Sequence, residues 1–174
     1  MMSRLLNPRL LNWSVLAAAS LGLAACGFTP LYGTPGVTSS LSAIQVATPE
    51  GRTGELIREH LDDVLARDSN VPAAYKMSLS LGEQRYPRGV RVDNVATRYE
   101  YVLVAAYVLT DAKTGAQAKK GQVRVEVTYD SADQPYASVA AQQDAQDRAA
   151  GEAARRIELE LAAWLAKPPT KPKT

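Results

Sequence analysis

Residues 98–110, RYEYVLVAAYVLT, constrain the fold of this chain more than any other segment. Between Val102 and Leu109 the side chains of both alternating sets are apolar. Successive side chains of a strand point to opposite faces, so this pattern predicts a central strand that is covered on both sides. One alternative stays open: Ala105 and Ala106 are small and single valines on a surface are ordinary, so the second face could do without cover.

Other segments predict further strands around this one. In residues 75–81 and 123–129 apolar residues occupy every second position, which is typical of strands with one wet face. Residues 41–47 predict a shorter strand that ends at the turn 48–51. The sequence DAKTG at 111–115 predicts a hairpin turn.

Two segments have helical periodicity instead. From Thr53 onward, apolar residues recur at the spacing of an amphipathic helix, which Asp68 to Pro72 should end. Residues 136–166 are rich in alanine and free of proline, and predict a long helix whose C-terminal half packs hardest. Gly151 is a mild weak point there, because glycine costs about 1 kcal/mol relative to alanine inside a helix.

The order of elements is thus β-α-β-β-β-α. We expect an α+β fold, a two-layer sandwich of a mostly antiparallel four-stranded sheet with two helices on one face. The opposite face has no helix left to cover it. If that face is apolar, it calls for a partner, a ligand or a membrane.

The N-terminus has the pattern of a secretory signal. Arg4 and Arg9 precede an apolar run at 15–23, which two small residues, Ala24 and Ala25, follow. The run is far shorter than the ~20 residues of a transmembrane helix, which disfavours a permanent spanning anchor. Cys26 follows directly and is the only cysteine, so an internal disulfide is excluded.

Residues 23–26, LAAC, resemble the bacterial lipobox. The resemblance implies cleavage before Cys26, an S-diacylglycerol group on its sulfur and an N-acyl chain, palmitate for example, on its new amine. Two or three fatty chains hold a protein at a membrane essentially permanently. Gly27, in place of an aspartate, resembles lipoproteins sent to the outer membrane. The alternative is an ordinary signal peptide with an unmodified thiol.

We therefore expect four segments: a signal peptide at 1–25, an acylated cysteine with a flexible tether at 26–40, a domain at 41–166, and a disordered basic tail at 167–174. The tether is rich in glycine and proline, and the tail in proline and lysine. Without the signal peptide the chain has 18 basic and 18 acidic residues. Such a neutral domain lacks the basic footprint of nucleic-acid binding.

Catalysis is not expected from this sequence. It has no nucleophile-elbow glycine pattern and no phosphate-binding loop. His60 is the only histidine and has no second histidine or free thiol to complete a metal or catalytic site, so we interpret it as a packed helix residue. We expect no metal and no cofactor other than the covalent lipid.

The segment CGFTPLYG at 26–33, continuing the lipobox, resembles the alphaproteobacterial form of the LptE family of lipopolysaccharide-assembly lipoproteins. Tyr136, Asp144, Ala145 and Arg148, ahead of an apolar helix, are also similar. The resemblance implies a lipid-anchored Gram-negative outer-membrane protein that sits as a plug in the lumen of the LptD β-barrel, in a 1:1 complex. It also implies a role in barrel assembly and contact with lipopolysaccharide. The alternative is a pilotin-like or other assembly lipoprotein that binds only protein.

Lipopolysaccharide carries phosphates and carboxylates, which arginine forks bind well. Two basic clusters are candidates. The first surrounds the turn expected after residues 75–81: Arg85, Arg88, Arg91 and Arg98. The second surrounds the next hairpin: Lys113, Lys119, Lys120 and Arg124. The alternative for each residue is a solvated charge that keeps a sheet edge from aggregating.

Overall fold

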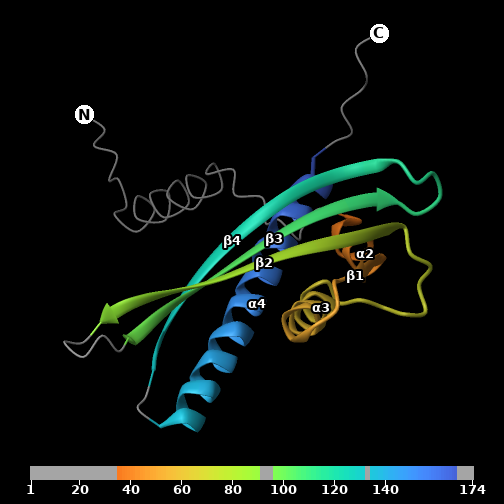
Figure 1. The fold of residues 1–174 in the computed structure, drawn as a ribbon. Helices are drawn as coiled ribbons and strands as arrows, with labels where there is room; N and C mark the ends of the chain where they lie inside the picture. The colour runs from red at the N-terminus through yellow and green to blue at the C-terminus, as the bar shows by residue number, and fades with distance from the viewer. Residues whose placement is uncertain (1–34, 91–95, 132–133, 168–174) are drawn as a thin grey trace, which may run out of the picture.

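A computed structural model describes residues 35–90, 96–131 and 134–167 of this chain (Figure 1). Its core element is a four-stranded sheet in the order β1-β2-β3-β4. The strands are β1 (Ile44–Ala47), β2 (Tyr75–Val90), β3 (Ala96–Asp111) and β4 (Gln117–Asp130). Strand β3 is antiparallel to both of its neighbours, β2 and β4, whereas the short β1 runs parallel to β2. The predicted α+β fold with a mostly antiparallel sheet is confirmed.

The helices share one side of this sheet. They are α2 (Val37–Ser42), α3 (Arg52–Val64) and α4 (Pro135–Leu165). Ile57 and Leu61 of α3 and Ile157 of α4 are fully buried in a core with Leu103 and Tyr107 of β3. Odd-numbered residues of β3 thus face the helices, as the alternation of side chains in a strand requires.

The expectation of a tether up to residue 40 is wrong for residues 37–40, because they belong to α2. Val37 and Leu41 of this helix are 2% and 3% exposed and join the core. Two apolar residues four positions apart are enough to anchor one turn and a half of helix against α4, although the composition of the segment favours a coil. Cys26 and residues 27–34 of the predicted tether lie outside the described residues.

The second face of β3 is apolar, as predicted, and no described helix lies on it. We call it the helix-free face. It has a stripe one strand wide, made of Val102, Val104, Ala106 and Val108. Polar partners on β2 and β4 flank the stripe; Val102, for example, lies between Gln84 and Glu126. Val102 is fully buried, whereas the other three remain partly exposed.

The β2–β3 hairpin is much longer than the periodicity indicates, and projects beyond α3 (Figure 1). β2 continues to Val90, so Arg85 and Arg88 lie within a strand and not in a turn as expected. The apolar alternation stops near Gly82 because the helices no longer cover the strand there, and side chains of both faces can be polar. The predicted turn at 111–115 is confirmed: Asp111 Oδ1 accepts hydrogen bonds from the backbone N–H groups of Lys113 and Thr114.

Candidate ligand-binding face

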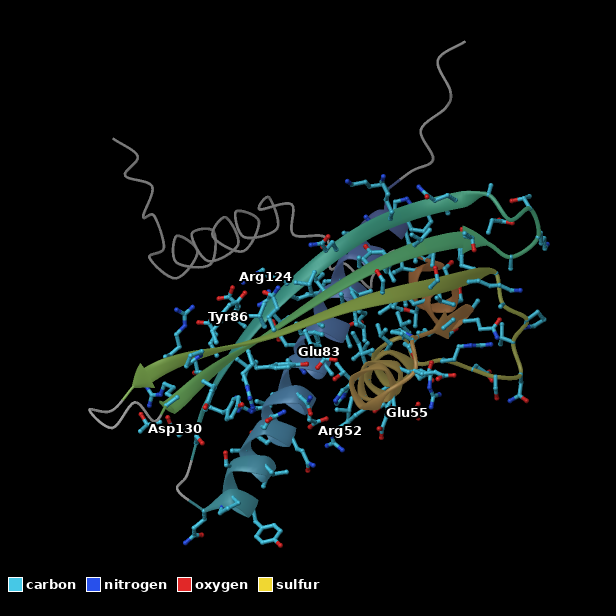
Figure 2. The ribbon with its side chains drawn as sticks, in the orientation of Figure 1. Arg52, Glu55, Glu83, Tyr86, Arg124 and Asp130 are labelled. Atoms are coloured by element: carbon cyan, nitrogen blue, oxygen red, sulfur yellow. The ribbon has the colours of Figure 1, made fainter. Side chains whose placement is uncertain are left out.

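Three arginines and three carboxylates gather on the helix-free face where the hairpin begins to project. We call this group the arginine–carboxylate patch, and it consists of Arg88, Arg98, Arg124, Glu100, Glu126 and Asp130. The strand register produces it, since Arg98 lies directly opposite Asp130 and Glu100 lies opposite Tyr86. Figure 2 shows Tyr86 and Arg124 over this part of the sheet, with Asp130 toward its end.

Each arginine of the patch has a carboxylate partner. Arg88 holds Glu100 with a two-pronged contact, from Nε to Oε2 at 3.1 Å and from Nη2 to Oε1 at 2.9 Å. Arg98 Nε lies 2.7 Å from Asp130 Oδ1. Arg124 Nε lies 2.8 Å from Oε1 of Glu126, two residues along the same strand. The patch therefore has little net charge, but its guanidinium groups are held in place.

The pKa values of these carboxyl groups reflect the pairing. The hydrogen bond from Arg88 lowers the pKa of Glu100 below its ordinary value, and the charge of Arg124 lowers it further. The hydrogen bond from Arg98 lowers the pKa of Asp130 in the same way. Both carboxylates thus stay ionised at neutral pH, and an anionic ligand has to displace them from the arginines.

A shallow pocket opens beside two of the arginines. It is lined by Arg88, Gly89, Thr97, Arg98 and Asp130. Arg88 is 55% exposed and Arg98 59% exposed, so both guanidinium groups can reach a ligand from the pocket wall. Thr97 donates its hydroxyl to Gly89 O at 3.2 Å, which joins the two strands here. Such a pocket can present two forks to one phosphate or carboxylate group.

The structure separates other members of the predicted clusters. Arg85 points to the helix side, where it donates to Gln142 of α4 at 2.8 Å and lies over the ring of Tyr99. Arg91 and Cys26 lie outside the described residues. In the second cluster, Lys113 belongs to the 111–115 turn, and Lys119 and Lys120 fall on opposite faces of β4.

Arg124 joins the first cluster and not the second. It lies four residues beyond Lys120, about 13 Å along the strand, and its charge acts on Glu100. The three carboxylates of the patch are not recognisable in the sequence, because cross-strand partners are known only once the strand register is known. Arg124 and Glu126 alone had a local signal, since residues i and i+2 of a strand share a face.

His60 is a packed helix residue, as predicted. Its Nε2 lies 2.9 Å from Oδ1 of Asp147, and the pair links α3 to α4. Among the described residues, no group of three or more His, Cys, Asp and Glu side chains could hold a metal ion. Within the same ranges, no helix combines the length and the apolar character needed to cross a membrane.

Comparison with known proteins assigns this chain to a family. The family model for LptE, described as lipopolysaccharide-assembly, matches residues 40–161. This chain belongs to the LptE family. The match runs from the end of α2 to the C-terminal part of α4, so it includes α3, most of α4 and the arginine–carboxylate patch. None of the curated proteins compared matches the chain.

Solved structures agree with the LptE fold. A crystal structure of a protein from Caulobacter crescentus, described as a lipoprotein, is 59% identical, covers 77% of this chain and 99% of its own, and has a TM-score of 0.67. Rare lipoprotein B from Shewanella oneidensis is 14% identical, covers 69% of this chain and 92% of its own, and has a TM-score of 0.52. Lipoprotein B from Nitrosomonas europaea is 15% identical, covers 71% of this chain and 83% of its own, and has a TM-score of 0.54. The last two show a shared fold alone.

Proposed function

We propose that this LptE family member is an outer-membrane lipoprotein, anchored through acylated Cys26, that acts as plug and assembly partner of an LptD β-barrel in lipopolysaccharide transport. The family match over residues 40–161 carries the proposal. The lipobox at 23–26 supports the anchor, because a diacylglycerol thioether needs one free sulfur directly after the cleavage site. The proposed role is structural and does not involve catalysis.

The helix-free face supports the proposed role as a plug in the barrel. Val104, Ala106 and Val108 form a narrow apolar stripe that the domain itself leaves partly exposed, flanked by Ser80 and Gly82 of β2 and by Gln122 and Arg124 of β4. An apolar stripe with polar borders can lie against the inner wall of a barrel. The near-neutral charge of the mature chain avoids the repulsion that a strongly charged plug would meet in a lumen lined with charged residues.

The arginine–carboxylate patch supports contact with lipopolysaccharide. A phosphate group carries more negative charge and more acceptor oxygens than a carboxylate, so it can replace Glu100 or Asp130 on Arg88 and Arg98. When a phosphate group replaces a carboxylate in this way, each guanidinium group keeps an anionic partner. Lys113, Lys119 and Lys120 are more dispersed and are secondary candidates.

Co-purification tests the assembly role. The full acylated chain, extracted in mild detergent, should bring down a large outer-membrane β-barrel in a ratio near one to one. Recovery of a secretin or another machine would support the pilotin-like alternative and contradict the plug. The intact mass of the mature chain checks the anchor, because an unmodified thiol at Cys26 would contradict it.

Matched arginine variants test the ligand contact. Arg88→Ala combined with Arg98→Ala should weaken lipopolysaccharide binding at low salt by about tenfold or more, since each charged hydrogen bond lost contributes about 1.5–3 kcal/mol. Arg58→Ala is the control, because Arg58 also pairs with carboxylates, Glu55 and Asp62, but lies on α3. Equal binding by the double variant and the control would discard the patch as the site.

A further inference from the structure

A groove lies beside the edge of the sheet, between strand β4 and helix α4. Its lining consists of Gln122, Val123, Arg124, Arg156, Leu159 and Glu160. Leu159 is a large apolar side chain of α4 and is 50% exposed, whereas Val123 is 5% exposed. An apolar side chain in the groove would remove Leu159 from water, so the groove suits an apolar occupant.

Strand β4 has an open edge next to this groove, because no described strand pairs with its outer side. Ser131 N donates to Thr97 O of β3 at 2.9 Å, which assigns the odd-numbered residues of β4 to the β3 ladder. Backbone groups alternate along an antiparallel strand, so the even-numbered N–H and C=O groups point outward. Arg124 O accepts a hydrogen bond from Arg156 Nη1 at 2.8 Å and has a second lone pair for another donor. The edge can therefore take one more strand.

Residues 27–34, GFTPLYGT, precede the described residues and include three large apolar side chains, Phe28, Leu31 and Tyr32, but no charged residue. A linker that only spans a distance needs no such side chains, and their exposure to water is unfavourable. Thr29 precedes a proline and is therefore biased toward an extended conformation. The segment thus has the composition of an extended apolar occupant.

The segment is long enough to reach the groove from α2. Helix α2 packs against α4, and the five Cα–Cα steps from Tyr32 to Val37 span up to about 17 Å when extended. A helix is about 10–12 Å across, so the chain can pass α4 and reach β4. Helix α2 leads into β1, and Ile44 of β1 aligns through Tyr75 with Asp111, at the end of the sheet where β4 begins (Figure 1). A segment that follows the edge toward α2 is therefore antiparallel to β4.

Pro30 determines which side chains of the segment face the groove. Proline has no N–H, and at a sheet edge it is tolerated where its backbone faces away from the neighbouring strand. Thr29 and Leu31 therefore bond to β4, opposite its even-numbered residues, and share the helix-free face with them. Phe28, Pro30 and Tyr32 then point to the helix side of the sheet, where the groove lies.

We propose that residues 28–32 form a short additional strand, antiparallel to β4, with Phe28 and Tyr32 packed against Leu159 in the groove. The docking occurs within one chain, so it is compatible with a one-to-one complex in a barrel lumen. Cys26 precedes the paired residues, so the docked segment holds the lipid toward the end of the sheet where β4 ends. The inference rests on the proposed cleavage and acylation at Cys26 and does not depend on the barrel.

Proteolysis of the full acylated chain in mild detergent tests the docking. Chymotrypsin cleaves after Phe28, Leu31 and Tyr32 only when the segment is released. Leu159→Glu places a carboxylate against the apolar side chains and should speed this cleavage by about tenfold or more, since proteolysis follows the population of the open form. Val139→Glu is the matched control, because Val139 is 54% exposed on the same helix, and it should be cleaved at the parent rate. Equal rates in the parent chain and a folded Leu159→Glu chain would overturn the proposal, and would favour the membrane interface or the barrel as the partner of the segment.

Disulfide trapping provides a second test that does not depend on a charge in the groove. Single cysteines at each position from 28 to 32 are combined with Leu159→Cys. The sulfur of Cys26 carries the lipid, so the introduced pair are the only thiols of the mature chain. Because a disulfide needs closely spaced Cβ atoms, cross-linking yields should alternate, with positions 28, 30 and 32 about fivefold above 29 and 31. A smooth profile is the result for a freely moving tether and would overturn the proposal. The intact mass reports the state of Cys26 separately, so failure of the anchor is distinguishable from failure of the docking.

Discussion

Three glycines inside helices or strands occupy quite different environments in the structure. A Cβ on Gly54 in α3 would lie 2.0 Å from the backbone oxygen of Pro49, and one on Gly121 in β4 would lie 2.5–2.6 Å from the phenol of Tyr107. A Cβ on Gly151 would lie 3.5 Å from the ring of His60, an ordinary van der Waals distance. Of these three glycines, only Gly151 thus has room for a Cβ atom.

We expect Gly151→Ala to raise the free energy of unfolding by up to about 1 kcal/mol, since alanine is the better helix former by that amount. Gly54→Ala should instead lower it by about 1–3 kcal/mol, because the backbone of residue 49 has to move. Urea denaturation of both variants and the parent measures the two effects. If Gly151→Ala were the more destabilising of the two, the packing of α3 against α4 described above would be wrong.

Two tyrosines of β3 should make the free energy of unfolding depend on pH in the alkaline range. Tyr107 donates to Oε2 of Glu160 at 2.7 Å, and Tyr101 donates to Oε2 of Glu83 at 2.6 Å. Burial, together with the adjacent carboxylate, raises the pKa of both phenols above the ordinary value. A raised pKa in the folded state contributes stability that is present below the pKa of the unfolded chain, about 10, and is lost as the pH rises above it.

The free energy of unfolding should therefore decline steeply above pH 10, and the decline should be shallower in Tyr101→Phe combined with Tyr107→Phe. At neutral pH the double variant should lose about 1–3 kcal/mol, because two net hydrogen bonds disappear. Tyr136→Phe is the matched control, since that side chain is 92% exposed. Chemical denaturation at several pH values gives the comparison, and parallel curves for parent and double variant would refute the explanation.

At the scale of elements, α4 has two unlike parts. Its first turns bury little, with Tyr136 and Val139 largely exposed, and full burial begins at Ala145. From there a wide face of small residues packs against α3 and the sheet: Ala149, Ala150, Gly151, Ala153 and Ala154. Small side chains let the helix approach both neighbours closely, so the alanines of this face have no space for larger side chains.

Ala153→Leu should lower the free energy of unfolding by about 1–3 kcal/mol through overpacking. Ala163→Leu lies on the exposed side of the same helix and should change it by less than about 0.5 kcal/mol. Thermal unfolding followed by circular dichroism distinguishes the two. Similar midpoints for both variants would show that the alanine face is not closely packed.

At the scale of the whole molecule, the sheet presents one face to its helices and one to its surroundings. If the helix-free face lies against a barrel wall, a charge at its centre should prevent assembly and leave the domain folded. Ala106→Glu adds such a charge to the partly exposed stripe, and Ala106→Ser is its matched control. We expect the glutamate variant to lose most of the co-purified barrel, at least tenfold relative to the serine variant. Retention of the barrel by a folded Ala106→Glu chain would assign the contact to another face.

The sequence alone determined the fold class and the succession of the four strands and the two longer helices. Apolar residues at every second position marked the strands at 75–81 and 123–129, and a run that is apolar on both faces marked the central strand at 98–110. Helical spacing marked the segments of α3 and α4. An element that is buried on one side has apolar residues at the repeat of its own secondary structure. The turn at 111–115 was equally local, since an aspartate and a glycine suffice to form it. The lipobox around Cys26 and its lipid remain predictions from the sequence.

Tertiary structure decided the rest. Helix α2 is stable because Val37 and Leu41 pack into the core. The part of β2 beyond Gly82 is stable because β3 pairs with it. Neither segment shows a clear periodic pattern of apolar residues in the sequence. The arginine–carboxylate patch depends on register: Arg98 meets Asp130 only because residues 32 positions apart lie opposite each other. Cross-strand neighbours are a property of how the whole sheet aligns, and local sequence patterns do not contain that information.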